Sequence, residues 1–190
     1  MSKVDRRILK SQEAIRKAII ELMSEKTFND ITIQEISDRA NVSRRTIYLH
    51  YTDKFDLLDK LIEEHINKLR ELCESAADMS HIDAELLSFK YFERNYLFFS
   101  SMLASQGAPY FHRRFLEFIL ERIQYKLERI KNKVDVKEGI NHGLSECDDV
   151  FIQFFGAAFV GIVEWWFKNG MPYPPHVMAQ RVGILLDRNL

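Results

Sequence analysis

The sequence has 190 residues and a formal net charge of −1, with 46% apolar and 29% charged residues. This balance is typical of a globular protein and excludes a disordered or collagen-like chain. Glycine and proline are few, with 7 Gly and 4 Pro, and all of them follow Gln106. A first half without either residue lacks the tight turns that a many-stranded sheet requires. We therefore predict an all-α fold.

The chain shows no targeting, redox or metal-binding pattern. The segment from Met1 to Lys10 is charged rather than apolar, and Cys73 and Cys147 do not have a metal-ligand or redox spacing. We expect a cytoplasmic protein with free thiols and with no metal or other cofactor. The longest apolar run, Val150 to Phe167, contains a glutamine and a glutamate. These polar residues favour a buried helix over a membrane span.

The N-terminal third begins with two predicted helices. Apolar residues at helical spacing predict a first helix over residues 8–26. Thr32 and Glu35 have the spacing of a capping box, so a second helix should begin at Ile33. It should be short, because Asn41, the non-glycine residue that best tolerates a left-handed backbone, follows it closely. We expect a tight turn there.

Ser43 can cap a third helix, which we predict over residues 44–51. Arg44 and Arg45 lie in its first turn, where a positive charge opposes the helix dipole. Such residues suggest an external partner. The major groove of DNA accepts one helix, and an arginine fork matches guanine O6 and N7. Up to Lys54 the chain carries 11 Lys and Arg against 8 Asp and Glu, a modest basic excess.

The segment from Thr32 to Leu58 resembles the DNA-binding domain of TetR-type transcriptional regulators. The residues that carry this resemblance are Ile31-Thr32-Ile33, Ile36, Ala40, Val42-Ser43, Thr46-Ile47-Tyr48, His50-Tyr51 and Asp53-Lys54. The resemblance implies an N-terminal three-helix helix-turn-helix DNA-binding domain, residues 1–54. It also implies a C-terminal helical domain, residues 55–190, that dimerises and senses an effector.

The same resemblance implies DNA-contact roles for six residues, and we expect a seventh, His50, to pack or to lie on the phosphate side. Thr32 would face a phosphate at the start of the second helix. Three residues would approach bases, Arg44, Arg45 and Thr46. Two would contact phosphates, Tyr48 and Lys54, although a lone tyrosine could equally pack on the helix surface. Arg45 departs from the family, which more often has a small residue there, so no operator sequence is predicted.

A long connector helix is predicted from residue 52 or 53 to about 77, followed by shorter helices near 84–92 and 94–103. Three further helices are expected near 110–131, 146–169 and 176–188, with a loop over 132–147 that includes a helix cap at Ser145. The segment 161–170 resembles the C-terminal region of one TetR subgroup. In this family the last two long helices form a four-helix dimer interface. We therefore expect a homodimer whose interface includes Phe155, Gly156, Phe159 and Val163.

Aromatic residues are concentrated in the second half, where 19 of the 23 lie between Phe89 and Tyr173. They could line a cavity for a flat or apolar effector, with polar contacts from Tyr96, His112, Gln153 or Glu164. Phenylalanines at helical spacing, such as 111/115/118 and 151/155/159, are more often core residues. We therefore assign no ligand-binding residue.

The resemblance implies a repressor that a small molecule releases from palindromic double-stranded operator DNA, which is the most common mode in the family. A transcriptional activator of the same fold remains an alternative, as does a helical protein-binding adaptor without sequence-specific DNA binding. An enzyme is disfavoured because the sequence has no phosphate-binding glycine loop, metal cluster or nucleophile-base pair. We expect no membrane partner.

Overall fold

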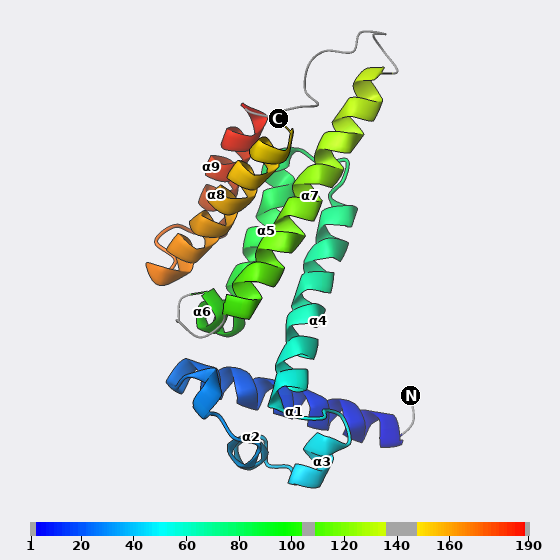
Figure 1. Ribbon diagram of the computed structural model, residues 1–190, viewed down its shortest axis with the longest axis vertical. Helices are drawn as coiled ribbons and strands as arrows, with labels where there is room; N and C mark the ends of the chain where they lie inside the picture. Colours follow the sequence, from blue (N-terminus) through cyan, green and yellow to red (C-terminus); the bar gives the residue numbers. More distant parts are fainter. Residues whose placement is uncertain (1–2, 104–108, 136–147, 189–190) are drawn as a thin grey trace. The chain divides into compact units, whose positions relative to one another are not determined.

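The computed structural model describes residues 3–103, 109–135 and 148–188. Over these residues the chain forms α-helices and one short 3-10 helix and has no strand, which confirms the predicted all-α class (Figure 1). The elements are α1 (Lys3–Glu25), η1 (Phe28–Asp30), α2 (Ile33–Ala40), α3 (Arg44–Tyr48), α4 (Lys54–Ser75), α5 (His81–Arg94), α6 (Tyr96–Leu103), α7 (Pro109–Asp135), α8 (Asp148–Lys168) and α9 (Pro175–Asp187).

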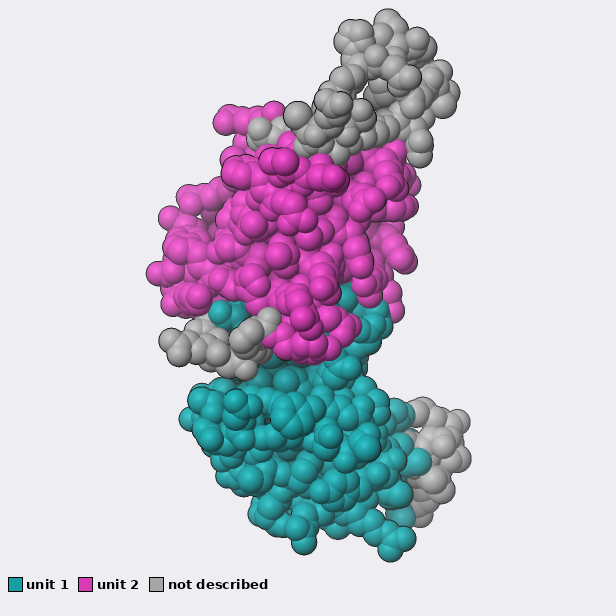
Figure 2. All heavy atoms as spheres, viewed as in Figure 1, with its two compact units in different colours: residues 1–68, 95–108 teal, residues 69–94, 109–190 magenta. Residues whose placement is uncertain are grey.

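The chain divides into two compact units, which are coloured in Figure 2. Unit 1 comprises residues 1–68 and 95–108, and unit 2 comprises residues 69–94 and 109–190. Helix α4 begins in unit 1 and ends in unit 2. These units are defined by packing, whereas the predicted division at residue 54 separates DNA binding from dimerisation and sensing, so the two boundaries need not coincide.

Unit 1 is held together by α1, which packs on both α2 and α6, and by contacts between α2 and α3. The isoleucine side chains that face inward are completely buried, namely Ile15, Ile19, Ile36, Ile47 and Ile62. Burying an aliphatic side chain of this size contributes about 1.5–3 kcal/mol. Helix α3 has five residues and depends on this packing, since so short a helix is unstable alone.

Helix α3 ends three residues earlier than predicted, at Tyr48. The residues that follow do not continue α3, because they cap the start of α4. There the Oδ1 atom of Asp53 accepts hydrogen bonds from the backbone N–H groups of Phe55 and Asp56, each at 2.8 Å. Tyr51, beyond the end of the helix, is buried and only 4% exposed.

Unit 2 consists of two packed helix pairs, α5 with α9 and α7 with α8 (Figure 1). Its core is aromatic and includes Phe89, Phe92, Phe111, Phe115 and Trp166, all of them buried. The rings of Phe89 and Trp166 meet edge to face at 5.3 Å between centroids. The phenylalanine stripe at 111/115/118 is therefore core, as the periodicity favoured.

Helix α5 begins at His81, three residues before its predicted start. Ser80 explains the earlier start, because its Oγ accepts from the N–H of Asp83 at 3.1 Å and donates to the Asp83 carboxylate at 2.6 Å. The predicted loop over 132–147 is replaced as far as residue 135 by a continuation of α7. The remainder of that loop, with Ser145 and Cys147, lies outside the described residues.

The small residue Gly183 brings α9 close to α5. A Cβ atom placed on it would lie 2.6 Å from Ile82 Cγ1 and 2.9 Å from Ile82 Cα. Because the second atom belongs to the backbone, only glycine fits at this contact.

Helix α8 has the length and apolar composition of a membrane span over Asp149–Lys168, although 33% of its most apolar 18-residue stretch is buried inside the structure. Its apolarity has a local explanation. One side contacts α7 and the aromatic core, and the other side carries exposed apolar residues that are described below.

Candidate nucleic-acid interface

The turn between α2 and α3 is made by Asn41, whose φ of 50° and ψ of 47° are left-handed as predicted. Ser37, which the sequence analysis did not single out, stabilises the turn through two hydrogen bonds to Val42. Its buried hydroxyl donates to the carbonyl of Val42 at 2.6 Å, and the N–H of Val42 donates to the carbonyl of Ser37 at 3.1 Å. These two bonds set the angle at which the chain enters α3.

Ser43 caps α3 as predicted. Its Oγ accepts from the backbone N–H of Thr46 at 3.1 Å and lies 2.9 Å from Thr46 Oγ1. Thr46 is therefore half-buried beside the capping residue Ser43, while Arg44 and Arg45 are exposed to solvent. Of the three residues expected to approach bases, the two arginines are the accessible ones.

The outer face of α3 and its C-terminal end is formed by Arg44, Arg45, Tyr48 and Leu49, with Tyr48 56% and Leu49 71% exposed. On the opposite face Ile47 is fully buried. No described residue makes a hydrogen bond or an ion pair with either arginine side chain. An exposed dicationic patch with adjacent hydroxyl and apolar groups can contact base edges, phosphates and thymine methyl groups.

Thr32 forms the complete capping box that the sequence predicts. Its Oγ1 accepts from the N–H of Glu35 at 3.2 Å, and the Glu35 carboxylate accepts from the N–H of Thr32 at 2.9 Å. Lys26, which the sequence analysis did not single out, pairs with the same carboxylate. The hydrogen bond from Lys26, with those from Thr32, lowers the pKa of Glu35 to about 2. This carboxylate therefore stays ionised and fixes the start of α2.

Lys54, expected to contact a phosphate, makes three hydrogen bonds within unit 1. Its Nζ donates to the carbonyl oxygens of Phe28 at 3.1 Å, Asn29 at 2.6 Å and Ile31 at 2.8 Å. The same ammonium lies 5.1 Å from the ring centroid of Phe28 and 5.5 Å from that of Phe55. All three of its donor protons are used within unit 1, so none is left for a phosphate in this conformation. Sequence spacing alone could not show this, because η1 lies far from Lys54 along the chain.

His50 is half-buried at the end of the α3 segment. Its ring lies edge to face with that of Tyr51 at 6.2 Å, and its backbone carbonyl accepts from Lys60 Nζ at 3.1 Å. This arrangement agrees with the packing role that the sequence analysis weighed for His50 beside the phosphate-side role.

Three of the four residues expected at a dimer interface are buried within the chain itself. Val163 is fully buried and Phe159 is 7% exposed. A Cβ atom on Gly156 would lie 2.5 Å from Leu120 Cδ2 of α7, so this glycine serves the contact between α7 and α8. Phe155 is half-buried. The family resemblance suggested these four positions, but it does not distinguish the inner face of α8 from its outer face, and both faces are apolar.

The described part of the chain contains no group of three or more His, Cys, Asp or Glu residues arranged to hold a metal ion. Cys73 is a free thiol in unit 2. Burial raises the pKa of this thiol above its ordinary value, which keeps it protonated and unreactive.

Two family models match the chain. One describes the bacterial regulatory proteins of the tetR family and matches residues 15–61, and the other describes a transcriptional regulator C-terminal region and matches residues 82–188. A curated relative, the uncharacterised HTH-type transcriptional regulator YxbF of Bacillus subtilis (strain 168), is 23% identical over 189 residues. The match covers 97% of this chain but 46% of YxbF, so the chain spans about half the length of that relative.

Solved structures agree in fold over nearly the whole chain. A TetR transcriptional regulator from Streptococcus agalactiae 2603V is 25% identical, with a TM-score of 0.69 and 96% of each chain covered. The regulator FadR of Bacillus subtilis in complex with stearoyl-CoA is 19% identical, with a TM-score of 0.68 and with 94% of this chain and 98% of that chain covered. Together with the turn, the capped α3 and its exposed arginines, these matches show that the chain belongs to the TetR family of DNA-binding transcriptional regulators.

Proposed function

We propose that the protein is a homodimeric repressor that binds a palindromic operator through α3 and is released by a small-molecule effector. The observation that carries the DNA-binding part is the pair of exposed arginines, Arg44 and Arg45, held on a short helix by the Asn41 turn and the Ser43 cap. Their charge opposes the α3 dipole and has no partner among the described residues, so it contributes to function rather than to local stability.

The contacts we propose follow the sequence analysis with one change. Arg44, Arg45 and Thr46 read bases, while Thr32, Tyr48 and His50 lie on the phosphate side. Lys54 supports the fold of unit 1 instead of touching DNA.

A second copy of the chain is the partner we propose for the exposed side of α8 and α9. The large apolar residues there are Val150, Phe154 and Trp165 on α8 and Ile184 and Leu185 on α9, which are 37% to 74% exposed. Apolar side chains gathered in this way mark an interaction surface. A two-fold dimer would present two copies of α3 to the two halves of a palindrome.

Gly161 offers a clean test of this surface, because no atom lies within 4 Å of a Cβ placed on it. Gly161→Arg should fold normally, as judged by its circular dichroism, and elute as a monomer in size-exclusion chromatography with light scattering. Gln124→Arg, on the exposed side of α7, is the matched control and should remain dimeric. A dimeric Gly161→Arg protein would place the interface elsewhere.

The DNA-binding proposal is tested by selecting bound sequences from a pool of random duplexes and then measuring affinity for the enriched site. Arg44→Ala and Arg45→Ala should each lower discrimination against mismatched sites by about 1–3 kcal/mol. Arg94→Ala is the matched control, since this exposed arginine lies in unit 2. If both α3 variants bind the selected site as tightly as the wild type, the base-reading assignment is wrong. Salt-labile binding without any enriched sequence would favour the adaptor alternative.

A further inference from the structure

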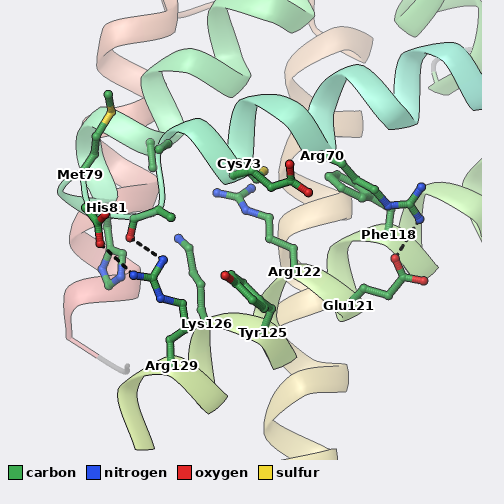
Figure 3. Close-up of a pocket in the computed structure, with 15 residues that line it drawn as sticks. Arg70, Cys73, Met79, His81, Phe118, Glu121, Arg122, Tyr125, Lys126 and Arg129 are labelled. Atoms are coloured by element: carbon green, nitrogen blue, oxygen red, sulfur yellow. Dashed lines mark hydrogen bonds and ion pairs between the residues drawn. The ribbon is translucent and has the colours of Figure 1, made fainter. Parts of the chain in front are cut away.

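Unit 2 contains a cavity of about 700 Å³ between the end of α4, the start of α5 and residues 118–129 of α7 (Figure 3). Its size lies within the range of small-molecule binding sites. Its walls include the buried side chains of Ala76, Ala84 and Phe118, and the ring of Tyr125. Phe118 and Tyr125 belong to the aromatic residues that the sequence analysis considered for an effector, whereas its four polar candidates, Tyr96, His112, Gln153 and Glu164, are not part of the lining.

Four cations line the cavity, and two of them are balanced by their own acids. Arg70 pairs with Glu121 at 2.9 Å. Arg129 pairs with Asp78 at 2.8 Å and also donates to the carbonyl of Ala77 at 3.2 Å. These pairs are visible in Figure 3 as dashed lines.

The other two cations, Arg122 and Lys126, share a single carboxylate. Glu85, which is fully buried, pairs closely with Arg122, whose side chain is 9% exposed. Lys126 Nζ lies 3.9 Å from the same Glu85 oxygen, beyond hydrogen-bonding distance, and is 24% exposed. The buried end of the cavity therefore carries one positive charge in excess. Glu74 also lines the cavity, and Asp187 pairs with the lining residue His81 at 2.6 Å, but both carboxylates are exposed, so solvent screens their negative charges.

The pKa shifts of Lys126 and Arg122 show which of the two positive charges is less well compensated. Burial and the charge of Arg122 lower the pKa of Lys126, while the Glu85 and Asp187 carboxylates oppose this shift. Although burial opposes the charge of Arg122, the Glu85 carboxylate raises its pKa above the ordinary value. Arg122 is thus stabilised by Glu85, whereas the charge of Lys126 is only partly compensated.

We propose that this cavity binds a small organic monocarboxylate with an apolar or aromatic body, the carboxylate held between Lys126 and Arg122 and the body lying against Phe118 and Tyr125. One negative charge matches the excess of one positive charge at the buried end. The proposal deepens the proposed function, because it names the chemical class of the effector, and it rests on that function only for the link between effector and operator.

The test compares three probes with the same body and different charge: 4-phenylbutanoate, the neutral 4-phenylbutanamide and the cationic 4-phenylbutylamine. Isothermal titration with the wild-type protein should show the carboxylate binding at least about tenfold more tightly than either of the others, as expected for a charge-assisted hydrogen bond. Lys126→Met should lose about tenfold in affinity for 4-phenylbutanoate while retaining the Arg122–Glu85 pair. Lys90→Met, an exposed lysine of α5 outside the cavity, should bind as the wild type does.

Several outcomes would overturn the proposal. These are equal or tighter binding of the amide or the amine, no binding of any probe, or a Lys126→Met affinity equal to that of the wild type. Because titration with the probes needs no DNA, its failure leaves the operator selection intact, and failure of the operator selection leaves this result intact. The two proposals therefore fail separately.

Discussion

Replacing Lys54 with methionine tests whether this residue supports the fold or contacts DNA. The change keeps the aliphatic stem but removes the ammonium that donates to the carbonyls of Phe28, Asn29 and Ile31. A hydrogen bond to a charged group contributes about 1.5–3 kcal/mol. Lys54 is partly exposed, so the freed carbonyls regain water and the three bonds do not add. We expect Lys54→Met to lower the free energy of unfolding by about 2–3 kcal/mol.

In a protein of this length such a loss lowers the melting temperature by about 5–10 °C. Thermal unfolding followed by circular dichroism at 222 nm measures the shift. Lys17→Met is the matched control in the same unit, because Lys17 is 75% exposed and makes one long ion pair with Glu21 at 3.8 Å. Its melting temperature should change by less than about 2 °C, since exposed ion pairs contribute little.

The salt dependence of DNA binding separates the two roles of Lys54. A lysine that contacts phosphate releases about one counterion, so its removal lowers the slope of log affinity against log salt by about 1. We expect the folded Lys54→Met protein to keep the wild-type slope. An unchanged melting temperature together with a reduced slope would refute the structural role and restore the phosphate contact.

Three further predictions concern stability. Gly183→Ala should lower the free energy of unfolding, measured in urea, by about 2 kcal/mol or more, because the added methyl group overpacks the contact with Ile82. Gly161→Ala, where the methyl group would enter open space, should change it by less than about 1 kcal/mol. Equal effects of the two substitutions would contradict the close contact. Burial, together with a nearby arginine charge, lowers the pKa of His65 from 6.5 to about 4, so the unfolded chain gains the proton first and stability falls as pH drops. His65→Phe should remove about 2 kcal/mol of the loss between pH 7 and pH 5, and an unchanged loss would refute the shift. Arg122→Met should cost about 3–5 kcal/mol by leaving Glu85 buried without its partner, and adding Glu85→Leu should recover most of it; no recovery would contradict the ion-pair account.

The helix-turn-helix region was predictable because its signals are local. A capping box, a left-handed Asn41 and the Ser43 cap each depend on residues within about four positions of one another, and all three are present in the structure. The absence of glycine and proline before residue 107 likewise predicted the helical class of unit 1.

The interactions that were missed join residues far apart in the chain. Lys54 reaches η1 and the following Ile31 across 23 to 26 residues, and the Glu85–Arg122 pair spans 37. The sequence also fails to distinguish the two faces of a helix when both are apolar. On α8 the family resemblance led us to expect Val163 at an interface, although this side chain is fully buried and exposed residues such as Phe154 form the outer face.

The role of the α3 arginines is tested most directly by selecting operator sequences from random duplexes with the wild-type protein and then with Arg45→Ala. We expect the wild type to enrich a palindrome and the variant to bind at the same palindrome spacing but with relaxed preference at one position in each half-site. Enrichment of an identical sequence by both proteins, at equal affinity, would contradict the claim that the exposed arginines of α3 read the operator.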